Sequence, residues 1–141
     1  MLQLQQMART GIRVSAVIIR DGKILLIHRF NQGKEYWVLP GGGIEDNETA
    51  EEAIKREIRE ETNLTMTSCR PAFKVTAFDD IEKKHPVFIC ETQGEFIKFS
   101  GPELDETTSD DNQYTPEWIK VAEVEKLTLY PDGLRNRLSN L

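Results

Sequence analysis

Residues 42–64 read GGIEDNETAEEAIKREIREETNL, and this stretch decides both the fold and the chemistry of the chain. Thr49 is followed three residues later by Glu52, which forms a capping box in which each side chain satisfies a backbone donor at a helix start. At the other end, Asn63 tolerates the left-handed backbone with which helices often end. The stretch therefore predicts a helix over residues 50–62 that follows a glycine-rich loop.

This helix carries carboxylates where an amphipathic helix should be apolar. At about 100° per residue, one stripe is formed by Ala50, Ala53, Ile54 and Ile58. Glu57 and Glu61 point into that stripe, and Glu60 lies on its flank. Burial, mutual repulsion and the negative end of the helix dipole all disfavour charge at this place. A divalent cation that binds a phosphate is the expected counter-ion.

A solvated acidic helix with salt bridges is the alternative, because that is the usual form of a Glu-rich helix. A pair between Glu52 and Arg56 would belong to it. Glu51, Glu52 and Lys55 face away from the apolar stripe and agree with this interpretation, whereas Glu57 and Glu61 do not. The inward-facing carboxylates therefore favour the metal hypothesis.

The same residues resemble the Nudix box, whose pattern is G-x5-E-x7-R-E-U-x-E-E-x-G-U, with U an aliphatic residue. The chain supplies it with Gly42, Glu48, Arg56, Glu57, Ile58, Glu60, Glu61 and Leu64. One position departs, since the last glycine is Asn63; both residues accept a left-handed backbone, so we expect the turn to survive. The preceding residues, Trp37-Val38-Leu39-Pro40-Gly41-Gly42, resemble the usual approach to the box.

The resemblance implies an α/β fold, a Nudix-type α/β/α sandwich around a mixed β-sheet, and the order of the expected elements agrees. Asp21-Gly22 is a strong hairpin signal between two apolar runs. The expected strands are Ile12–Arg20, Lys23–Arg29, Tyr36–Leu39, Leu64–Phe78 (broken near Arg70-Pro71), Pro86–Phe96 and Glu117–Val121. A loop is expected over 31–35, a charged turn over 79–85, irregular chain over 97–115 and a closing helix over 131–138. Residues 1–10 are expected to be a flexible arm, and residues 11–141 a single domain.

The resemblance also implies roles for the residues of the box. It assigns Glu57, Glu60 and Glu61, with the carbonyl of Gly41, to a metal ion, and the hard oxygen donors suit Mg²⁺, with Mn²⁺ as a substitute. Gly42, Glu48 and Arg56 are then structural support, the last two bracing the loop against the helix. The general base stays open between Glu57 and the acidic segment 103–111, in which Asp110 and Asp111 are the favoured catalytic candidates.

The expected reaction is Mg²⁺-dependent pyrophosphohydrolysis, in which activated water attacks a nucleoside diphosphate linked to another moiety. The alternative is a non-catalytic Nudix-like domain that binds a nucleotide metabolite. A purely structural acidic domain conflicts with the inward-facing carboxylates. Candidates for base stacking are Phe30, Tyr36, Trp37 and Phe78, and candidates for phosphate contact are Arg13 and Arg29. Strand aromatics more often pack in a core, however.

Composition agrees with a compact enzyme of 141 residues, of which 38% are hydrophobic and 30% charged. The net charge of −6 argues against a general nucleic-acid binder, and no apolar run is long enough to predict a membrane span. Cys69 and Cys90 are expected to be reduced and packed. His85 is expected at the surface and His28 in the core. A cytoplasmic location and a homodimer complete the expectations.

Overall fold

The structure is a computed structural model that describes residues 9–77, 80–97, 112–131 and 133–139. Its strands are β1 (Arg9–Arg20), β2 (Lys23–Asn31), β3 (Lys34–Val38), β4 (Gly41–Glu45), β5 (Thr65–Ala77), β6 (Asp80–Gln93) and β7 (Asn112–Lys120). Its helices are α2 (Ala50–Thr62), a 3₁₀ helix (Val121–Lys126) and α3 (Leu134–Ser139). The expected arm over residues 1–10 falls mostly outside the described residues, and Arg9 already belongs to β1.

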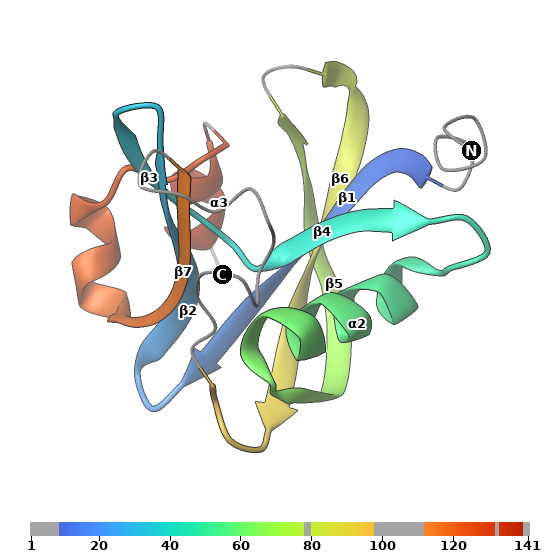
Figure 1. The fold of residues 1–141 in the computed structure, drawn as a ribbon, viewed down its shortest axis with the longest axis horizontal. Coiled ribbons are helices and arrows are strands. Elements are labelled where there is room, and N and C mark those ends of the chain that lie inside the picture. Colours follow the sequence, from blue (N-terminus) through green and yellow to red (C-terminus); the bar gives the residue numbers. More distant parts are fainter. Residues whose placement is uncertain (1–8, 78–79, 98–111, 132, 140–141) are drawn as a thin grey trace.

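Strand β1 joins two parts of a mixed sheet (Figure 1). In the first part, the β1 sheet, β1 pairs antiparallel with β4 and parallel with β6, and β6 pairs antiparallel with β5. In the second part, the β2 sheet, β2 pairs antiparallel with both β3 and β7. The mixed sheet with packed helices confirms the predicted α/β class.

Two tight turns connect β1, β2 and β3. The predicted hairpin at Asp21-Gly22 is confirmed, because Arg20 lies opposite Lys23 and the turn residues have φ angles of 54° and 76°. The loop predicted over 31–35 is wrong, since Asn31 lies opposite Lys34 across a second two-residue turn, in which Gln32 has a φ of 53°. Glutamine is not a usual residue at a left-handed turn position, so Gln32-Gly33 lacks the Asn-Gly or Asp-Gly pattern that predicts a two-residue hairpin turn.

Helix α2 matches the prediction at both ends. The Thr49 side chain accepts from the backbone N–H of Glu52, the Glu52 side chain accepts from that of Thr49, and Asn63 ends the helix with a φ of 67°. Ala53, Ile54 and Ile58 are fully buried against the β1 sheet. At roughly 1.5–3 kcal/mol for each fully buried isoleucine side chain, this apolar stripe anchors the helix.

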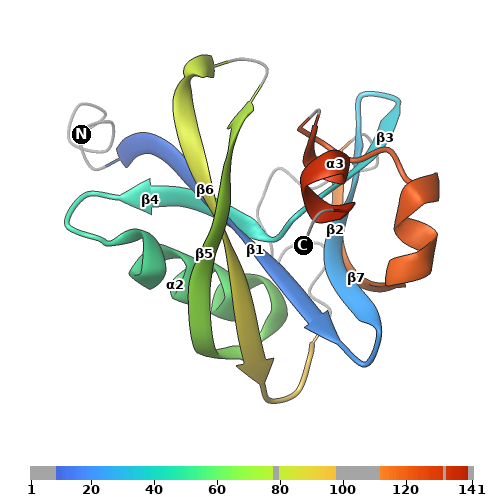
Figure 2. The same ribbon diagram turned by 180° about the vertical axis from the view of Figure 1, so that it is seen from behind.

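A second hydrophobic core lies on the opposite face of the β1 sheet. Side chains alternate along β1, so Val14 and Ala16 pack in the core beneath α2, whereas Val17 packs with Leu26 of β2 and Leu134 of α3. Figure 2 shows α2 and α3 from behind, with β5 and β6 in front of the rest of the sheet. The fold is therefore layered, and the start of β4 meets β1 and the last turns of α2 at one place.

Several boundaries in the later part of the chain differ from the prediction. Strand β6 begins at Asp80, so the charged turn predicted over 79–85 is wrong, and His85 is buried rather than at the surface. Strand β5 continues past Pro71 through a shift in register instead of breaking. Backbone pairing in a long hairpin tolerates charged side chains, which explains the error. Strand β7 begins at Asn112 rather than 117, and residues 98–111 lie outside the described part.

Each helix in the described ranges is too short or too polar to span a bilayer.

Candidate functional site

Two glycines at the start of β4 bring the backbone close to its neighbours. A Cβ atom on Gly41 would lie 2.0 Å from the carbonyl oxygen of Val14, and one on Gly42 would lie 2.4 Å from Oε1 of Glu57. A Cβ at position 41 would collide with backbone, whereas one at position 42 would displace the Glu57 carboxylate. The loop and the carboxylate end of α2 are therefore in direct contact.

Glu61 is the most enclosed carboxylate of this site, with 7% of the residue exposed. Its Oε1 accepts a hydrogen bond of 2.9 Å from the backbone N–H of Gly41, and its Oε2 accepts one from the hydroxyl of Tyr114 on β7. Burial raises the pKa of Glu61 well above its usual value, the charge of Glu57 adds to the rise, and the Gly41 hydrogen bond opposes it. Ionisation of Glu61 is therefore less favourable in the folded protein than in water.

Glu57 and Glu60 both accept hydrogen bonds from the Arg56 guanidinium. Nη1 of Arg56 donates to Oε1 of Glu57 at 2.8 Å and to Oε1 of Glu60 at 3.1 Å. Burial nevertheless raises the pKa of Glu57, because desolvation of its carboxylate outweighs the Arg56 contact. Glu60, by contrast, has an exposed side chain. The three acids thus form a gradient from buried Glu61 to solvated Glu60.

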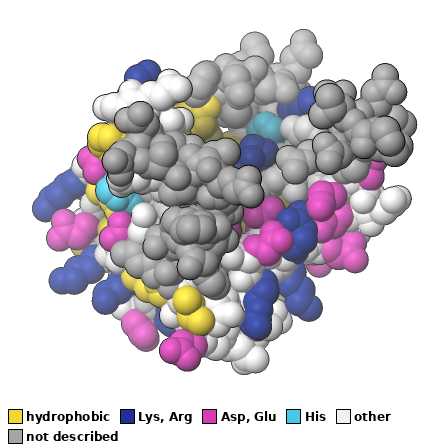
Figure 3. Space-filling view, in the orientation of Figure 1, with side chains coloured by type: hydrophobic (Ala, Val, Ile, Leu, Met, Phe, Trp, Pro, Cys, Tyr) yellow, Lys and Arg dark blue, Asp and Glu magenta, His cyan; other side chains and the backbone are white. Residues whose placement is uncertain are grey.

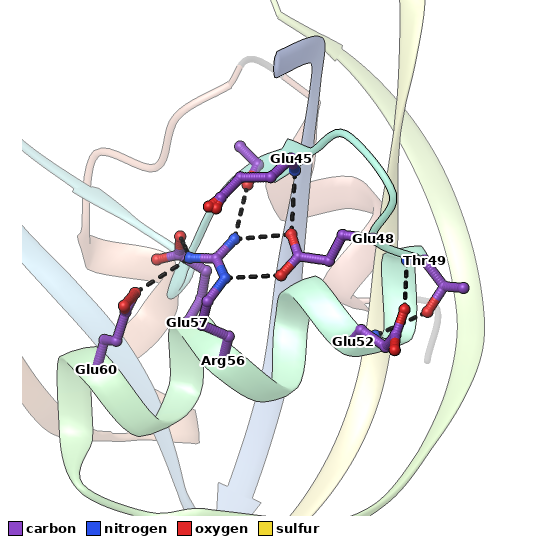
Figure 4. A network of polar contacts seen from close by, with 8 residues as sticks. Glu45, Glu48, Thr49, Glu52, Arg56, Glu57 and Glu60 are labelled. Atoms are coloured by element: carbon purple, nitrogen blue, oxygen red, sulfur yellow. Dashed lines mark hydrogen bonds and ion pairs between the residues drawn. The ribbon is translucent and has the colours of Figure 1, made fainter. Parts of the chain in front are cut away.

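A second edge of the Arg56 guanidinium, formed by Nε and Nη2, connects the loop to the helix (Figure 4). Nε and Nη2 donate to the two carboxylate oxygens of Glu48 at 2.8 Å and 2.9 Å, and Nη2 also donates to the carbonyl of Gly43 at 3.1 Å. Oε1 of Glu48 accepts from the backbone N–H of Glu45 as well. These bonds lower the pKa of Glu48 to about 2, with Arg56 as the main cause.

The salt bridge considered between Glu52 and Arg56 is replaced by the cap, since the Glu52 carboxylate accepts from the backbone N–H of Thr49 at 2.8 Å. Figure 3 shows acidic side chains gathered around basic ones on the face that carries β4 and α2. The Glu-rich helix is therefore not a uniformly solvated surface, because its inner carboxylates belong to a buried network.

The donors of this network suit a divalent cation in their chemistry. They are hard carboxylate oxygens that repel one another, and burial destabilises the charge on two of them, Glu57 and Glu61. In the described ranges, however, no three His, Cys, Asp or Glu side chains already surround one point. Arg56 contacts both Glu57 and Glu60, so an ion bound by these two carboxylates would replace its hydrogen bonds to them.

A cavity of about 280 Å³ begins beside Glu61 and runs between the β1 sheet and the β2 sheet. Gly41 and Tyr114, the two residues that donate to Glu61, both line it. The Arg29 guanidinium lies 5.0 Å from the centre of the Tyr114 ring. Glu61 therefore lies at the margin of a cavity with a cationic and aromatic wall.

The structure divides the residues considered for ligand contact. Arg13, Arg29 and Tyr36 line the cavity, whereas Trp37 stacks on His28 with ring centres 4.1 Å apart. Phe30 is 38% exposed. Phe78 and the catalytic candidates Asp110 and Asp111 lie outside the described residues.

Tyr114, Tyr130 and His85 are among the residues of the cavity wall that were not predicted from the sequence as part of a site. Each reaches the site through pairing or packing between segments far apart in the chain, and no local pattern marks it. His28, expected in the core, is half-buried on β2 between Glu35 and Glu117.

A mixed sheet in which a glycine-rich strand is followed by a helix that carries Glu57, Glu60 and Glu61 defines a Nudix-type α/β domain. The NUDIX domain family model matches residues 9–139, and the chain belongs to this family.

Relatives of known name match the chain mainly over a short segment. The ADP-ribose pyrophosphatase of Methanocaldococcus jannaschii is 52% identical over 55 residues, which are 38% of this chain and 32% of that protein. The CTP pyrophosphohydrolase of Escherichia coli is 43% identical over 56 residues, 38% of this chain and 42% of that protein. The chain thus aligns with well under half the length of these relatives.

Solved structures match it over nearly its whole length. The MutT NUDIX hydrolase of Burkholderia pseudomallei has a TM-score of 0.64 at 24% identity, and covers 92% of this chain and 96% of its own. A NUDIX hydrolase from Nitrosomonas europaea has a TM-score of 0.65 at 18% identity, and covers 92% and 86%. At these identities the likeness establishes the fold.

Proposed function

We propose that this protein is a Mg²⁺-dependent pyrophosphohydrolase that cleaves a phosphoanhydride bond in a nucleoside diphosphate linked to another moiety. The observation that carries the proposal is the placement of Glu57 and Glu61. Both are withdrawn from solvent beside the close-packed glycines of β4, where burial opposes their charge. The cavity begins at the same place, so a cation bound there would meet the phosphates of a ligand.

Glu57, Glu60, Glu61 and the carbonyl of Gly41 would hold the ion, with Mn²⁺ as a substitute for Mg²⁺. A divalent cation in such a site neutralises phosphate charge and activates water. Binding requires Glu57 and Glu60 to leave Arg56, which keeps its two bonds to Glu48 and so stays in place. Because Arg56 is anchored separately, the helix need not move when the carboxylates turn.

The residues of the chain itself supply orientation and proton transfer. Arg13 and Arg29 line the cavity and are the proposed phosphate contacts, and Tyr36 is the proposed aromatic surface for the base. Glu57 is one candidate for the general base, and Asp110 or Asp111 is the other. The homodimer and the cytoplasmic location remain predictions from the sequence.

The names of the relatives indicate which kind of bond is cleaved, but they do not indicate which leaving group is released. ADP-ribose pyrophosphatase, CTP pyrophosphohydrolase and RNA pyrophosphohydrolase share a reaction at a phosphoanhydride attached to a nucleoside. We therefore assign the substrate class as a nucleotide with at least two linked phosphates.

A substrate screen tests the proposal. ADP-ribose, CTP, 8-oxo-dGTP and a short RNA with a 5′-triphosphate are incubated with the protein in Mg²⁺ and, separately, in EDTA. We expect phosphate-bond cleavage of at least one substrate that disappears with EDTA. Turnover that persists in EDTA contradicts the metal role. Binding of these nucleotides without turnover of any of them would instead favour the non-catalytic alternative.

A further inference from the structure

His85 lines the cavity and carries a buried hydrogen-bond donor. It lies on β6, and only 6% of the residue is exposed. Its Nδ1 accepts a hydrogen bond of 2.9 Å from the backbone N–H of Arg13 on β1. A ring nitrogen that accepts cannot carry a proton, so in the neutral ring the proton is on Nε2. The fold itself thus fixes which nitrogen of His85 is the donor.

That donor has no acceptor within the part of the chain that the structure describes. Nε2 of His85 is buried and makes no hydrogen bond there. Buried polar groups are nearly always paired, because an unpaired donor loses its bond to water without a replacement. His85 also lines the cavity. An acceptor supplied by a ligand in this cavity would satisfy it.

The surroundings of His85 select the kind of acceptor. Val75 lies directly opposite His85 across the β5–β6 pairing, Val87 is two residues further along the same face of β6, and both line the cavity. Two apolar side chains favour a neutral acceptor at this position over an anionic phosphate, for which the neighbouring Arg13 is the proposed contact. A flat heterocycle is suited to such a wall, because its faces pack on apolar side chains while its edge makes a directional hydrogen bond.

We propose that His85 is a specificity-determining residue whose Nε2–H donates to an acceptor atom on the edge of the substrate's nucleobase. This inference rests on the proposed function, since it takes the ligand to be a nucleotide. The phosphates then lie toward Gly41 and Glu61, and the base lies toward β5 and β6. His85 reads the base and takes no part in proton transfer.

The test uses His85→Asn, whose Oδ1 replaces Nδ1 as the acceptor for the Arg13 N–H but which has no group at the position of Nε2. Binding is measured by calorimetry in EDTA, with the four common nucleoside monophosphates, ribose 5-phosphate and inorganic phosphate as probes. We expect the tightest nucleoside monophosphate to lose about tenfold in affinity, as for one buried hydrogen bond. Ribose 5-phosphate should bind as before, and the differences among bases should shrink.

His28→Asn is the matched control, because His28 lies on Trp37 and outside the cavity wall. The chain has only 2 histidines, so the same variant assigns the ¹⁵N signals of the imidazoles in the unsubstituted protein. There the Nε2 signal of His85 should shift when the tightest monophosphate is added. This measurement decides the matter if His85→Asn does not fold.

Four results would overturn the inference: unchanged affinities in His85→Asn, an equal loss for ribose 5-phosphate, a His85 Nε2 signal that does not respond to saturating nucleotide, or no nucleotide binding in EDTA. Because no metal is present, these outcomes are separate from the fate of the proposed function. A protein without hydrolase activity can still bind bases through His85, and an active one can fail to use it.

Discussion

The backbone N–H of Gly41 donates to Oε1 of Glu61, and this 2.9 Å bond joins the glycine strand to the last turn of α2. It orients a carboxylate whose pKa burial raises, and it opposes that rise only in part. The Tyr114 hydroxyl holds the other oxygen from β7. Glu61 is thus positioned by three separate elements of the fold, as expected of a side chain that must keep one geometry.

Replacement of Glu61 by Gln tests whether its charge, rather than its shape, matters. Gln keeps an acceptor for the Gly41 N–H but removes the buried negative charge. We expect hydrolysis in Mg²⁺ to fall by at least about 100-fold, as for loss of a key charge-stabilising group. The free energy of unfolding at pH 7, measured in urea, should be equal or higher, because the repulsion with Glu57 is relieved. Unchanged turnover would remove Glu61 from the mechanism.

Gly42→Ala tests the close approach of the glycine strand to Glu57. The added methyl would lie 2.4 Å from Oε1 of Glu57, so the carboxylate must move. We expect a loss of activity together with about 1–3 kcal/mol of stability, the usual cost of overpacking.

Gly43→Ala is the control for Gly42→Ala, because a Cβ at position 43 meets nothing within 4 Å. Its activity should match that of the parent when both are assayed on the same substrate. Equal damage in the two variants would show that loss of backbone freedom, and not the contact with Glu57, explains the effect.

The parts of the site that could be predicted from the sequence are those made by neighbours in the chain. Thr49, Glu52 and Asn63 act within one or two helical turns, so their residue types reveal the ends of α2. The facing of Glu57 and Glu61 follows from helical geometry alone. Tyr114 and His85 reach the site across sequence separations of 53 and 72 residues, through bonds to Glu61 and to the backbone of Arg13. Strand pairing decides such contacts, and one sequence does not specify its register.

Variants of Asn63 test how the turn at the end of the box tolerates a residue other than the usual glycine. Its φ of 67° is left-handed, and its side-chain amide donates to the carbonyl of Glu95 at 3.0 Å. Asn63→Ala should cost roughly 1–2 kcal/mol in urea unfolding, because alanine is strained in this conformation. Asn63→Gly relieves the strain but loses the Glu95 bond, so it should lie between the alanine variant and the parent. Equal stability of all three would mean that the turn does not depend on this residue.

Glu48 gives the protein a pH-dependent element of stability that is separate from the carboxylates proposed to bind metal. Arg56 holds the pKa of Glu48 at about 2 in the folded protein, against 4.5 for an unperturbed side chain. A lowered pKa means that the unfolded chain binds the proton more readily. The Glu48 contribution is therefore complete above pH 4.5 and is lost as the pH falls toward 2.

Other acids also titrate in this range, so the useful quantity is the difference in unfolding free energy between the parent and Glu48→Gln. We expect the parent to be more stable at pH 7, because Gln cannot form the charged two-point contact with Arg56. The difference should narrow between pH 4.5 and pH 2, since protonated Glu48 resembles Gln. Glu51→Gln, on the exposed first turn of α2, should change stability little at either pH. A difference that stays constant with pH would show that Glu48 acts through packing and neutral hydrogen bonds, and that the Arg56 brace does not depend on its charge.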